Sequence, residues 1–226
     1  MIEAVIFDLD GTLLDTLDDL TNAVNHALGV LGYAALDRAT VKRFVGNGIR
    51  KLTDRALVYS QSRGERYESE NGEKIEHAEQ CFELCRTYYA EHGKENTRLY
   101  DGVKEMLDRI KSMGVKTAVV TNKLDSAAQT LRTEFFPDVD FVIGLKDGIN
   151  PKPAPDGVNA ALKVLGVDKH SCIYVGDGET DMLTAKNCGL PAIAVTWGFR
   201  DREVLSAFSP EYIVEDPEEI VRIIGE

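Results

Sequence analysis

Cysteine and histidine are scarce in this sequence, and their positions argue against a disulfide framework and against a zinc site. The 226 residues include four cysteines and four histidines. The cysteines form no Cys-x-x-Cys pair, and a chain of this length does not need disulfides to stabilise its core. We therefore expect reduced thiols. Because the histidines are scattered, we expect no zinc.

Long apolar runs are also missing. The longest, such as Leu190 to Trp197, fall far short of the ~20 residues that a membrane-spanning helix needs. The N-terminus shows no basic segment and no cleavage site before its first apolar residues, so we expect no signal peptide. These absences favour a cytoplasmic protein that does not partner with a membrane.

Basic residues are in deficit. The chain has 26 Lys and Arg against 38 Asp and Glu, a formal net charge of −12. Such an acidic chain is a poor general ligand for nucleic acid or for anionic membranes, so we expect neither as a partner. A small anionic substrate is still compatible with this charge if a local cation or metal offsets the field.

Two patterns of secondary structure divide the sequence. Ala4 to Phe7 is an apolar run of strand length. From Thr16 to about Thr97 the apolar periodicity is helical, with a long helix expected at Glu73 to His92 after a polar loop at Ser60 to Gly72. Beyond this block, strands and helices alternate. Further strands are expected at Lys116–Val120, Asp140–Ile143, Cys172–Val175, Ala192–Val195 and Tyr212–Val214.

Alternating strands and helices indicate βαβ units, and hence a mostly parallel sheet with helices on both faces. We therefore expect an α/β fold with a Rossmann-like parallel sheet. This core comprises residues 1–15 and 97–226. An all-helical domain is inserted over residues 16–96.

Polar side chains follow several of the predicted strands. In an open parallel sheet, sites form beyond the carboxyl ends of the strands, so these side chains are expected to gather at one edge. A lysine between two prolines stands before a predicted helix and is expected at the same edge. The residues concerned are Asp8, Asp10, Thr12, Thr121, Asn122, Lys123, Lys152, Asp177 and Asp181.

This grouping has a chemical logic. Carboxylates that lie close together repel each other and raise each other's pKa. A hard divalent cation relieves the repulsion, and oxygen ligands of this kind suit Mg²⁺. Mg²⁺ and a lysine ammonium both attract phosphate, and a carboxylate held beside the phosphorus can attack it to form an acyl phosphate.

The same residues resemble the four motifs of the haloacid dehalogenase superfamily, in its phosphatase branch. Asp8-Leu9-Asp10-Gly11-Thr12 resembles the first motif, and Thr121 fits the second. Lys152, in Pro151-Lys152-Pro153, fits the third, and the segment from Gly176 to Asp181 fits the fourth. The helical insert is similar to the family's C1-type cap. Within this branch the sequence most resembles the phosphoglycolate phosphatases.

The resemblance implies a Mg²⁺-dependent phosphomonoester hydrolase that works through an aspartyl phosphate. Asp8 would be the nucleophile and a metal ligand. Asp10 would protonate the leaving oxygen and then activate water, and its backbone carbonyl would contact the metal. Asp177 would be the third metal ligand. Asp181 would orient the metal shell or Lys152.

The resemblance also implies a phosphate-binding set. Thr121, the amide of Asn122 and Lys152 would hold the phosphoryl group. Gly11 would let the chain leave its strand without blocking the site, and Thr12 would lie beside it. The expected substrate is a small phosphorylated metabolite, with phosphoglycolate as the first choice.

A glycine-rich segment in the helical insert is a candidate for substrate recognition. Gly46-Asn47-Gly48 is followed by Arg50 and Lys51, and Gly48 and Arg50 are expected to contact the far, anionic end of the substrate. The alternative is a turn between two helices with a solvated basic start, because glycine commonly marks turns.

Several functional alternatives stay open at this point. A sugar phosphomutase shares the four motifs, although such mutases usually carry a histidine soon after the first motif, in the neighbourhood that Leu20 occupies here. A pyrophosphatase of the same family and a phosphate- or metal-binding protein without activity are the others. One departure from the family follows the first Asp of the fourth motif, where many relatives have Ser or Thr and this chain has Gly178-Glu179. The relation of Glu179 to the metal is therefore open. The choice between monomer and homodimer is open as well.

Overall fold

The computed structural model describes residues 1–69 and 73–225. By its internal contacts the chain divides into two compact units. The α/β unit comprises Met1–Asp15 and Arg98–Glu226, and the helical unit comprises Thr16–Thr97. Among the described residues, no helix combines the length and the apolar character needed to cross a membrane.

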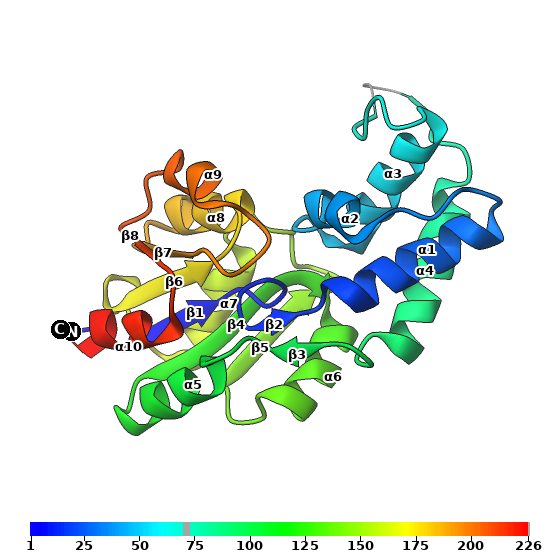
Figure 1. Cartoon of the computed structure of the whole chain (residues 1–226). Helices are drawn as coiled ribbons and strands as arrows, with labels where there is room; N and C mark the ends of the chain where they lie inside the picture. The colour runs from blue at the N-terminus through cyan, green and yellow to red at the C-terminus, as the bar shows by residue number, and fades with distance from the viewer. Residues whose placement is uncertain (70–72, 226) are drawn as a thin grey trace. The chain divides into compact units, whose positions relative to one another are not determined.

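The α/β unit is built on a parallel sheet, which confirms the expected Rossmann-like α/β class (Figure 1). Its described strands run in the order β5-β4-β1-β6-β7-β8, and all neighbours pair in parallel. The strand order reverses at β1, with β4 and β5 on one side and β6 to β8 on the other. A ligand crevice is therefore expected at the carboxyl end of β1. The strands are β1 (Ala4–Phe7), β4 (Lys116–Leu124), β5 (Phe141–Leu145), β6 (Cys172–Gly176), β7 (Ala192–Val195) and β8 (Tyr212–Val214).

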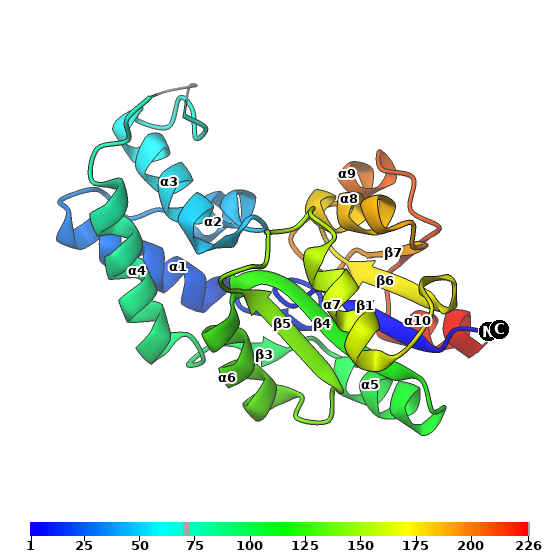
Figure 2. The same ribbon diagram turned by 180° about the vertical axis from the view of Figure 1, so that it is seen from behind.

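Helices cover both faces of this sheet, as the two opposite views show (Figures 1 and 2). Along β1, Val5 and Phe7 pack with α5, α6 and α10, whereas Ala4 and Ile6 pack with α7, α8 and α9. Because both faces of the strand are buried, its sequence is continuously apolar rather than alternating. The helices are α5 (Val103–Ser112), α6 (Asp125–Phe135), α7 (Asp156–Leu165), α8 (Glu179–Cys188), α9 (Arg202–Ser206) and α10 (Pro217–Gly225), with a 3₁₀ turn, η1, at Lys169–Ser171.

The helical unit contains α1 (Leu17–Val30), α2 (Arg38–Phe44), α3 (Gly48–Gln61) and α4 (Ala78–His92), with no strand among its described residues. The expected helix at Glu73 to His92 was wrong at its start. His77 adopts a left-handed conformation with φ of 60°, which interrupts the helix, so α4 begins only at Ala78. The expected loop at Ser60 to Gly72 starts later than predicted because α3 runs to Gln61, and residues 70–72 lie outside the described residues.

A small antiparallel ribbon, which the sequence did not predict, joins the two chain segments that flank the helical unit. β2 (Leu14–Asp15) pairs with β3 (Arg98–Leu99). Arg98 Nη2 also lies 2.9 Å from Asp15 Oδ2. Strands of two residues carry no detectable periodicity, so only the tertiary pairing reveals them.

β4 is longer than its sequence suggested. The expected strand ended at Val120, but β4 continues to Leu124, with a register shift between Val120 and Leu124. Thr121, Asn122 and Lys123 therefore lie in an irregular stretch of the strand rather than after it. Such irregularities commonly redirect side chains at functional sites.

Candidate active site

Three buried carboxylates lie together at the carboxyl end of the central strands. Asp8 directly follows β1, Asp177 directly follows β6, and Asp181 lies in the first turn of α8. One oxygen of each lies within 4.8 Å of the others. These three acids thus lie at one edge of the sheet, as their positions after predicted strands led us to expect.

Lys152 is the cation within this group. Its Nζ donates hydrogen bonds to Asp8 Oδ1 at 2.6 Å and to Asp181 Oδ1 at 2.7 Å. Nζ also lies 3.2 Å from the hydroxyl of Tyr174, which in turn donates to Asp181 Oδ1 at 3.2 Å. A buried ammonium with carboxylate partners is favourable only with such close geometry, so Lys152 fixes the relative positions of Asp8 and Asp181.

Asn122 holds the backbone of Lys152 in place. The Lys152 amide donates to Asn122 Oδ1 at 2.7 Å, and Asn122 Nδ2 donates to the Lys152 carbonyl at 3.1 Å. This reciprocal pair joins the irregular end of β4 to the loop before α7. The side chain of Asn122 therefore positions the lysine. The expected contact of its backbone amide with phosphate stays a prediction.

Burial and neighbouring charges shift the pKa values of several groups in this site. Burial, and next the charge of Asp181, raise the pKa of Asp8 from 3.8 to about 7, although Lys152 acts in the opposite direction. Burial and the charges of Asp181 and Asp8 raise the pKa of Asp177 well above its usual range. Burial works to lower the pKa of Lys152, but Asp181 and Asp8 outweigh it, so that this pKa lies well above its usual range.

Gly11 allows the loop after β1 to approach Asp177. Its φ of 93° favours glycine, and a Cβ at this position would lie 2.2 Å from Asp177 Oδ2. The hydroxyl of Thr12 lies 3.5 Å from Asp177 Oδ1. Gly11 and Thr12 thus contact an expected metal ligand, and their expected role at the phosphate stays a prediction.

The segment after β7 also supports Asp177. The Phe199 amide donates to Asp177 Oδ2 at 2.6 Å, and the indole of Trp197 donates to the Thr12 carbonyl at 3.0 Å. Arg200 Nε donates to Glu179 Oε2 at 2.8 Å. Glu179 is therefore directed to Arg200, and among the described residues it is not part of the three-carboxylate group.

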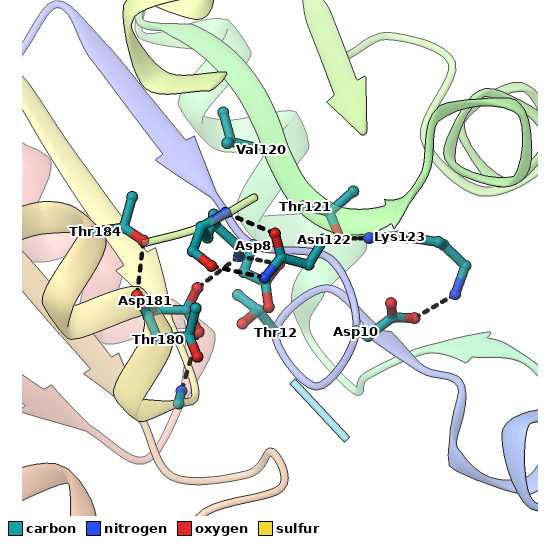
Figure 3. A network of polar contacts seen from close by, with 12 residues as sticks. Asp8, Asp10, Thr12, Val120, Thr121, Asn122, Lys123, Thr180, Asp181 and Thr184 are labelled. Carbon is teal, nitrogen blue, oxygen red and sulfur yellow. Dashed lines mark hydrogen bonds and ion pairs between the residues drawn. The ribbon is translucent and has the colours of Figure 1, made fainter. Parts of the chain in front are cut away.

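Asp10 lies apart from the three carboxylates. Its Oδ1 accepts a hydrogen bond from Lys123 Nζ at 2.7 Å, and Figure 3 shows its carboxylate pointing toward Lys123 rather than toward Asp8. The hydroxyl of Thr121 accepts from the Lys123 amide at 3.2 Å. Because Phe7 pairs with Val119 in the parallel sheet, Thr121 lies at the same edge as Asp8, as the strand-end pattern predicts. The role of Thr121 at the phosphate stays a prediction.

Gly48 and Arg50, the two expected substrate contacts of the insert, belong to the helical unit. Gly48 begins α3 with φ of 83°. Arg50 Nη2 donates to Glu79 Oε2 at 2.7 Å, and its guanidinium lies 3.9 Å from the ring centroid of Phe82. Arg50 is thus engaged within its own unit, and its contact with substrate stays a prediction.

Three contributors to the site were given no role in the sequence analysis. Tyr174 is an aromatic residue inside a buried strand, which is typical of core packing. Lys123 follows Thr121 and Asn122, and this proximity was its only signal. The Phe199 amide carries no side-chain signal at all, since a backbone donor is invisible in a sequence.

The donor set fits a hard divalent cation. Three buried carboxylates face a single ammonium, and burial together with the neighbouring carboxylate charges raises the pKa values of Asp8 and Asp177. Oxygen donors without nitrogen or sulfur ligands suit Mg²⁺.

Comparison with known proteins identifies the family. The sequence model described as haloacid dehalogenase-like hydrolase matches residues 5–195. The chain belongs to this hydrolase family. The match includes all four motifs, so the expected resemblance is confirmed, and the protein is a hydrolase of the phosphatase type.

Individual relatives of this hydrolase are also named as phosphatases. It is 32% identical to a phosphoglycolate phosphatase of Vibrio parahaemolyticus, over 99% of this chain and 96% of that protein. It is 30% identical to pyrophosphatase PpaX of Bacillus velezensis, over 99% of this chain and 97% of that protein. A crystal structure of a proposed phosphoglycolate phosphatase from Lactobacillus delbrueckii subsp. bulgaricus superposes with a TM-score of 0.93, at 36% identity and 99% coverage of both chains.

Proposed function

We propose that this hydrolase removes the phosphoryl group from a small phosphomonoester through an aspartyl phosphate on Asp8, with Mg²⁺ as cofactor and phosphoglycolate as substrate. The observation that carries the proposal is the position of Asp8. It stands at the carboxyl end of the central strand, 2.6 Å from the Lys152 ammonium and within 4.8 Å of two further carboxylates. A nucleophile for phosphoryl transfer needs a nearby cation and a poorly hydrated setting of this kind.

Each residue of the site has its own role in the proposed reaction. A carboxylate oxygen of Asp8 forms a bond to phosphorus while the bond from phosphorus to the leaving oxygen breaks. Asp10 gives that oxygen a proton, and it later takes a proton from the water that hydrolyses the aspartyl phosphate. Lys152 and the hydroxyl of Thr121 stabilise charge on the phosphoryl oxygens.

Asp8, Asp177 and the backbone carbonyl of Asp10 would hold Mg²⁺, with Asp181 orienting Lys152. When bound, the ion neutralises carboxylate charge and polarises the phosphoryl group. The chain's own part is to place these oxygens, which it does through the Phe199 amide on Asp177 and the close approach of Gly11.

Phosphoglycolate is favoured because relatives of that name match nearly the whole chain, among them one from Neisseria meningitidis at 35% identity. Pyrophosphate is the second candidate, supported by the similarity to pyrophosphatase PpaX. The helical unit would act as the cap that selects a small substrate, and a cytoplasmic location stays a prediction.

The test is phosphate release with Mg²⁺ from phosphoglycolate, pyrophosphate and β-glucose 1-phosphate. Asp8→Asn serves as the blank, and Asp108→Asn, which changes an exposed carboxylate, serves as the matched control. We expect phosphoglycolate to be the best substrate and activity to vanish only in Asp8→Asn. Conversion of glucose 1-phosphate to its 6-isomer without phosphate release would indicate a mutase instead. Mg²⁺ binding without any turnover would indicate a binding protein.

A further inference from the structure

The hydroxyl of Tyr174 lies among the residues of the site, although its ring belongs to the core. The side chain is completely buried, in the apolar cluster that includes Ile6 and Val120. Its oxygen accepts a hydrogen bond from Lys152 Nζ at 3.2 Å, and its single proton faces Asp181 Oδ1 at 3.2 Å and the Val120 carbonyl at 3.4 Å. A phenylalanine would fill the same space, and a buried hydroxyl costs free energy unless it is hydrogen-bonded. These polar contacts are therefore what the hydroxyl adds to the core.

The Lys152 ammonium needs partners of its own to stay in place. Asn122 fixes the backbone of Lys152, but the ammonium stands at the end of a flexible four-carbon stem. Its three protons have three acceptors among the described residues, namely Asp8 Oδ1 at 2.6 Å, Asp181 Oδ1 at 2.7 Å and the Tyr174 hydroxyl at 3.2 Å. These three contacts determine where the ammonium points.

The three acceptors do not persist equally through the proposed reaction. When Asp8 bonds to phosphorus, its carboxylate becomes an acyl phosphate and loses its own charge, so it accepts from Lys152 more weakly. Asp181 keeps its charge, and the Gly178 amide holds its second oxygen at 3.1 Å. Tyr174 is fixed by its packing in the core. During the reaction the ammonium is therefore held by Asp181 and Tyr174, and the proton that faced Asp8 can turn to a phosphoryl oxygen.

We propose that the Tyr174 hydroxyl is a positioning group that keeps the Lys152 ammonium directed at the phosphoryl group once Asp8 is bonded to phosphorus. The inference rests on the proposed function and deepens it, because it identifies a group that holds the phosphoryl-binding lysine. Tyr174 acts through Lys152 and Asp181 rather than on the substrate. The alternative is a hydroxyl that is only accommodated in the core, whose removal would change stability but not what Lys152 binds.

Steady-state kinetics with phosphoglycolate test the first consequence. In Tyr174→Phe we expect kcat to fall about 10-fold, the low end of the range for a hydrogen bond to a charged group. KM should change by less than about 2-fold, since Asp8 still holds the ammonium before it bonds to phosphorus. Tyr212→Phe removes the hydroxyl of an exposed tyrosine in β8 and is the matched control, with both parameters unchanged. An unchanged kcat in Tyr174→Phe, or a rise in KM alone, would overturn the inference.

Binding of beryllofluoride, which coordinates a carboxylate oxygen and mimics an acyl phosphate, gives a readout that does not depend on turnover. In calorimetric titrations with Mg²⁺, Tyr174→Phe should weaken beryllofluoride binding about 10-fold and inorganic phosphate binding by less than about 2-fold. In a Lys152→Met background, Tyr174→Phe should leave beryllofluoride binding unchanged, because the group that it positions is missing. An equal loss for both ligands, or in both backgrounds, would mark a purely structural role and overturn the inference. Lys152→Gln replaces Lys152→Met if the latter does not fold.

The proposed function can fail separately from this inference. A wild type that binds beryllofluoride but does not hydrolyse phosphoglycolate would contradict the proposed substrate, and the binding comparison would still decide the role of Tyr174. A wild type that binds no beryllofluoride in the presence of Mg²⁺ would contradict the aspartyl phosphate on Asp8, and with it the inference.

Discussion

Lys152 balances only part of the charge that surrounds it. Its ammonium contacts Asp8 and Asp181, while Asp177 is held by the Phe199 amide and the Thr12 hydroxyl. Burial, and next the charge of Asp181, raise the pKa of Asp8 to about 7. A nucleophile with this pKa is only partly ionised at neutral pH, so the site is built to be completed by a cation.

Asp177→Asn should stabilise the protein in the absence of divalent cations. The folded-state pKa of Asp177 is raised, so the folded protein binds more protons than the unfolded chain, and stability is lost as pH rises above about 4. With EDTA at pH 8, we expect the variant to melt about 3 °C higher than wild type. Near pH 4 the two should melt alike. The same gain at both pH values would show that ionisation of the buried Asp177 carboxyl is not the cause.

Asp10→Asn should lower kcat for phosphoglycolate by about 10²- to 10⁴-fold, the usual contribution of general acid–base catalysis. p-Nitrophenyl phosphate has a leaving group that needs no proton, so the loss in its first step should be smaller. Single-turnover release of the leaving group measures that step. Equal losses for the two esters would contradict the role of Asp10 as proton donor.

At the scale of elements, apolar runs predicted the strands well. β1, β7 and β8 begin and end at the residues expected. β1 and β7 are continuous apolar segments because they are buried throughout, whereas β8 is a partly exposed edge strand. The start of α4 was missed because the left-handed turn at His77 interrupts a periodic pattern without changing it. The ribbon of β2 and β3 depends on pairing between distant segments, which periodicity does not report.

The candidate site, like the secondary structure, could be predicted only in part from the sequence. Asp8, Asp177 and Lys152 follow from the strand-end rule together with the motifs. The pairing of Asp10 with Lys123 did not follow, because it depends on the extension of β4 beyond Val120. The contacts of Tyr174 did not follow either, since a tyrosine inside a strand is ordinarily a core residue.

Hydrogen bonds to Asp19 connect the start of the helical unit to its end. This carboxylate in the first turn of α1 is 2% exposed. It accepts from the amides of Asn96 and Thr97 at 3.0 and 2.9 Å, and from the Thr97 hydroxyl at 2.8 Å. These contacts hold Thr97 to the helical unit, of which it is the last residue.

Asp19→Ala should therefore lower the free energy of unfolding by about 3 kcal/mol, since it leaves several buried donors unsatisfied. The neighbouring Asp18→Ala is the control. Asp18 forms an exposed ion pair with Arg38, so its loss should cost about 0.5 kcal/mol. Urea titration measures both values, and equal effects would show that burial of Asp19 does not matter.

At the scale of the whole molecule, the two units should respond differently to Mg²⁺. All the expected ligands lie in the α/β unit. Binding to the folded state alone should stabilise that unit by about 2.7 kcal/mol when the ion is present at 100 times its Kd.

Hydrogen exchange with and without Mg²⁺ measures this difference. We expect added protection at the ends of β1 and β6 and little change in the interiors of α1 and α4. In Asp177→Asn the added protection should be absent at the same Mg²⁺ concentration. Protection that persists unchanged in this variant would place the ion elsewhere.

The central claim is that Asp8 carries the phosphoryl group during turnover. The most direct measurement is mass spectrometry of acid-quenched protein after brief mixing with phosphoglycolate and Mg²⁺. The account predicts one added phosphoryl group on the peptide that contains Asp8, and none in Asp8→Asn. Turnover that persists in Asp8→Asn, or a phosphoryl group found on another residue, would contradict it.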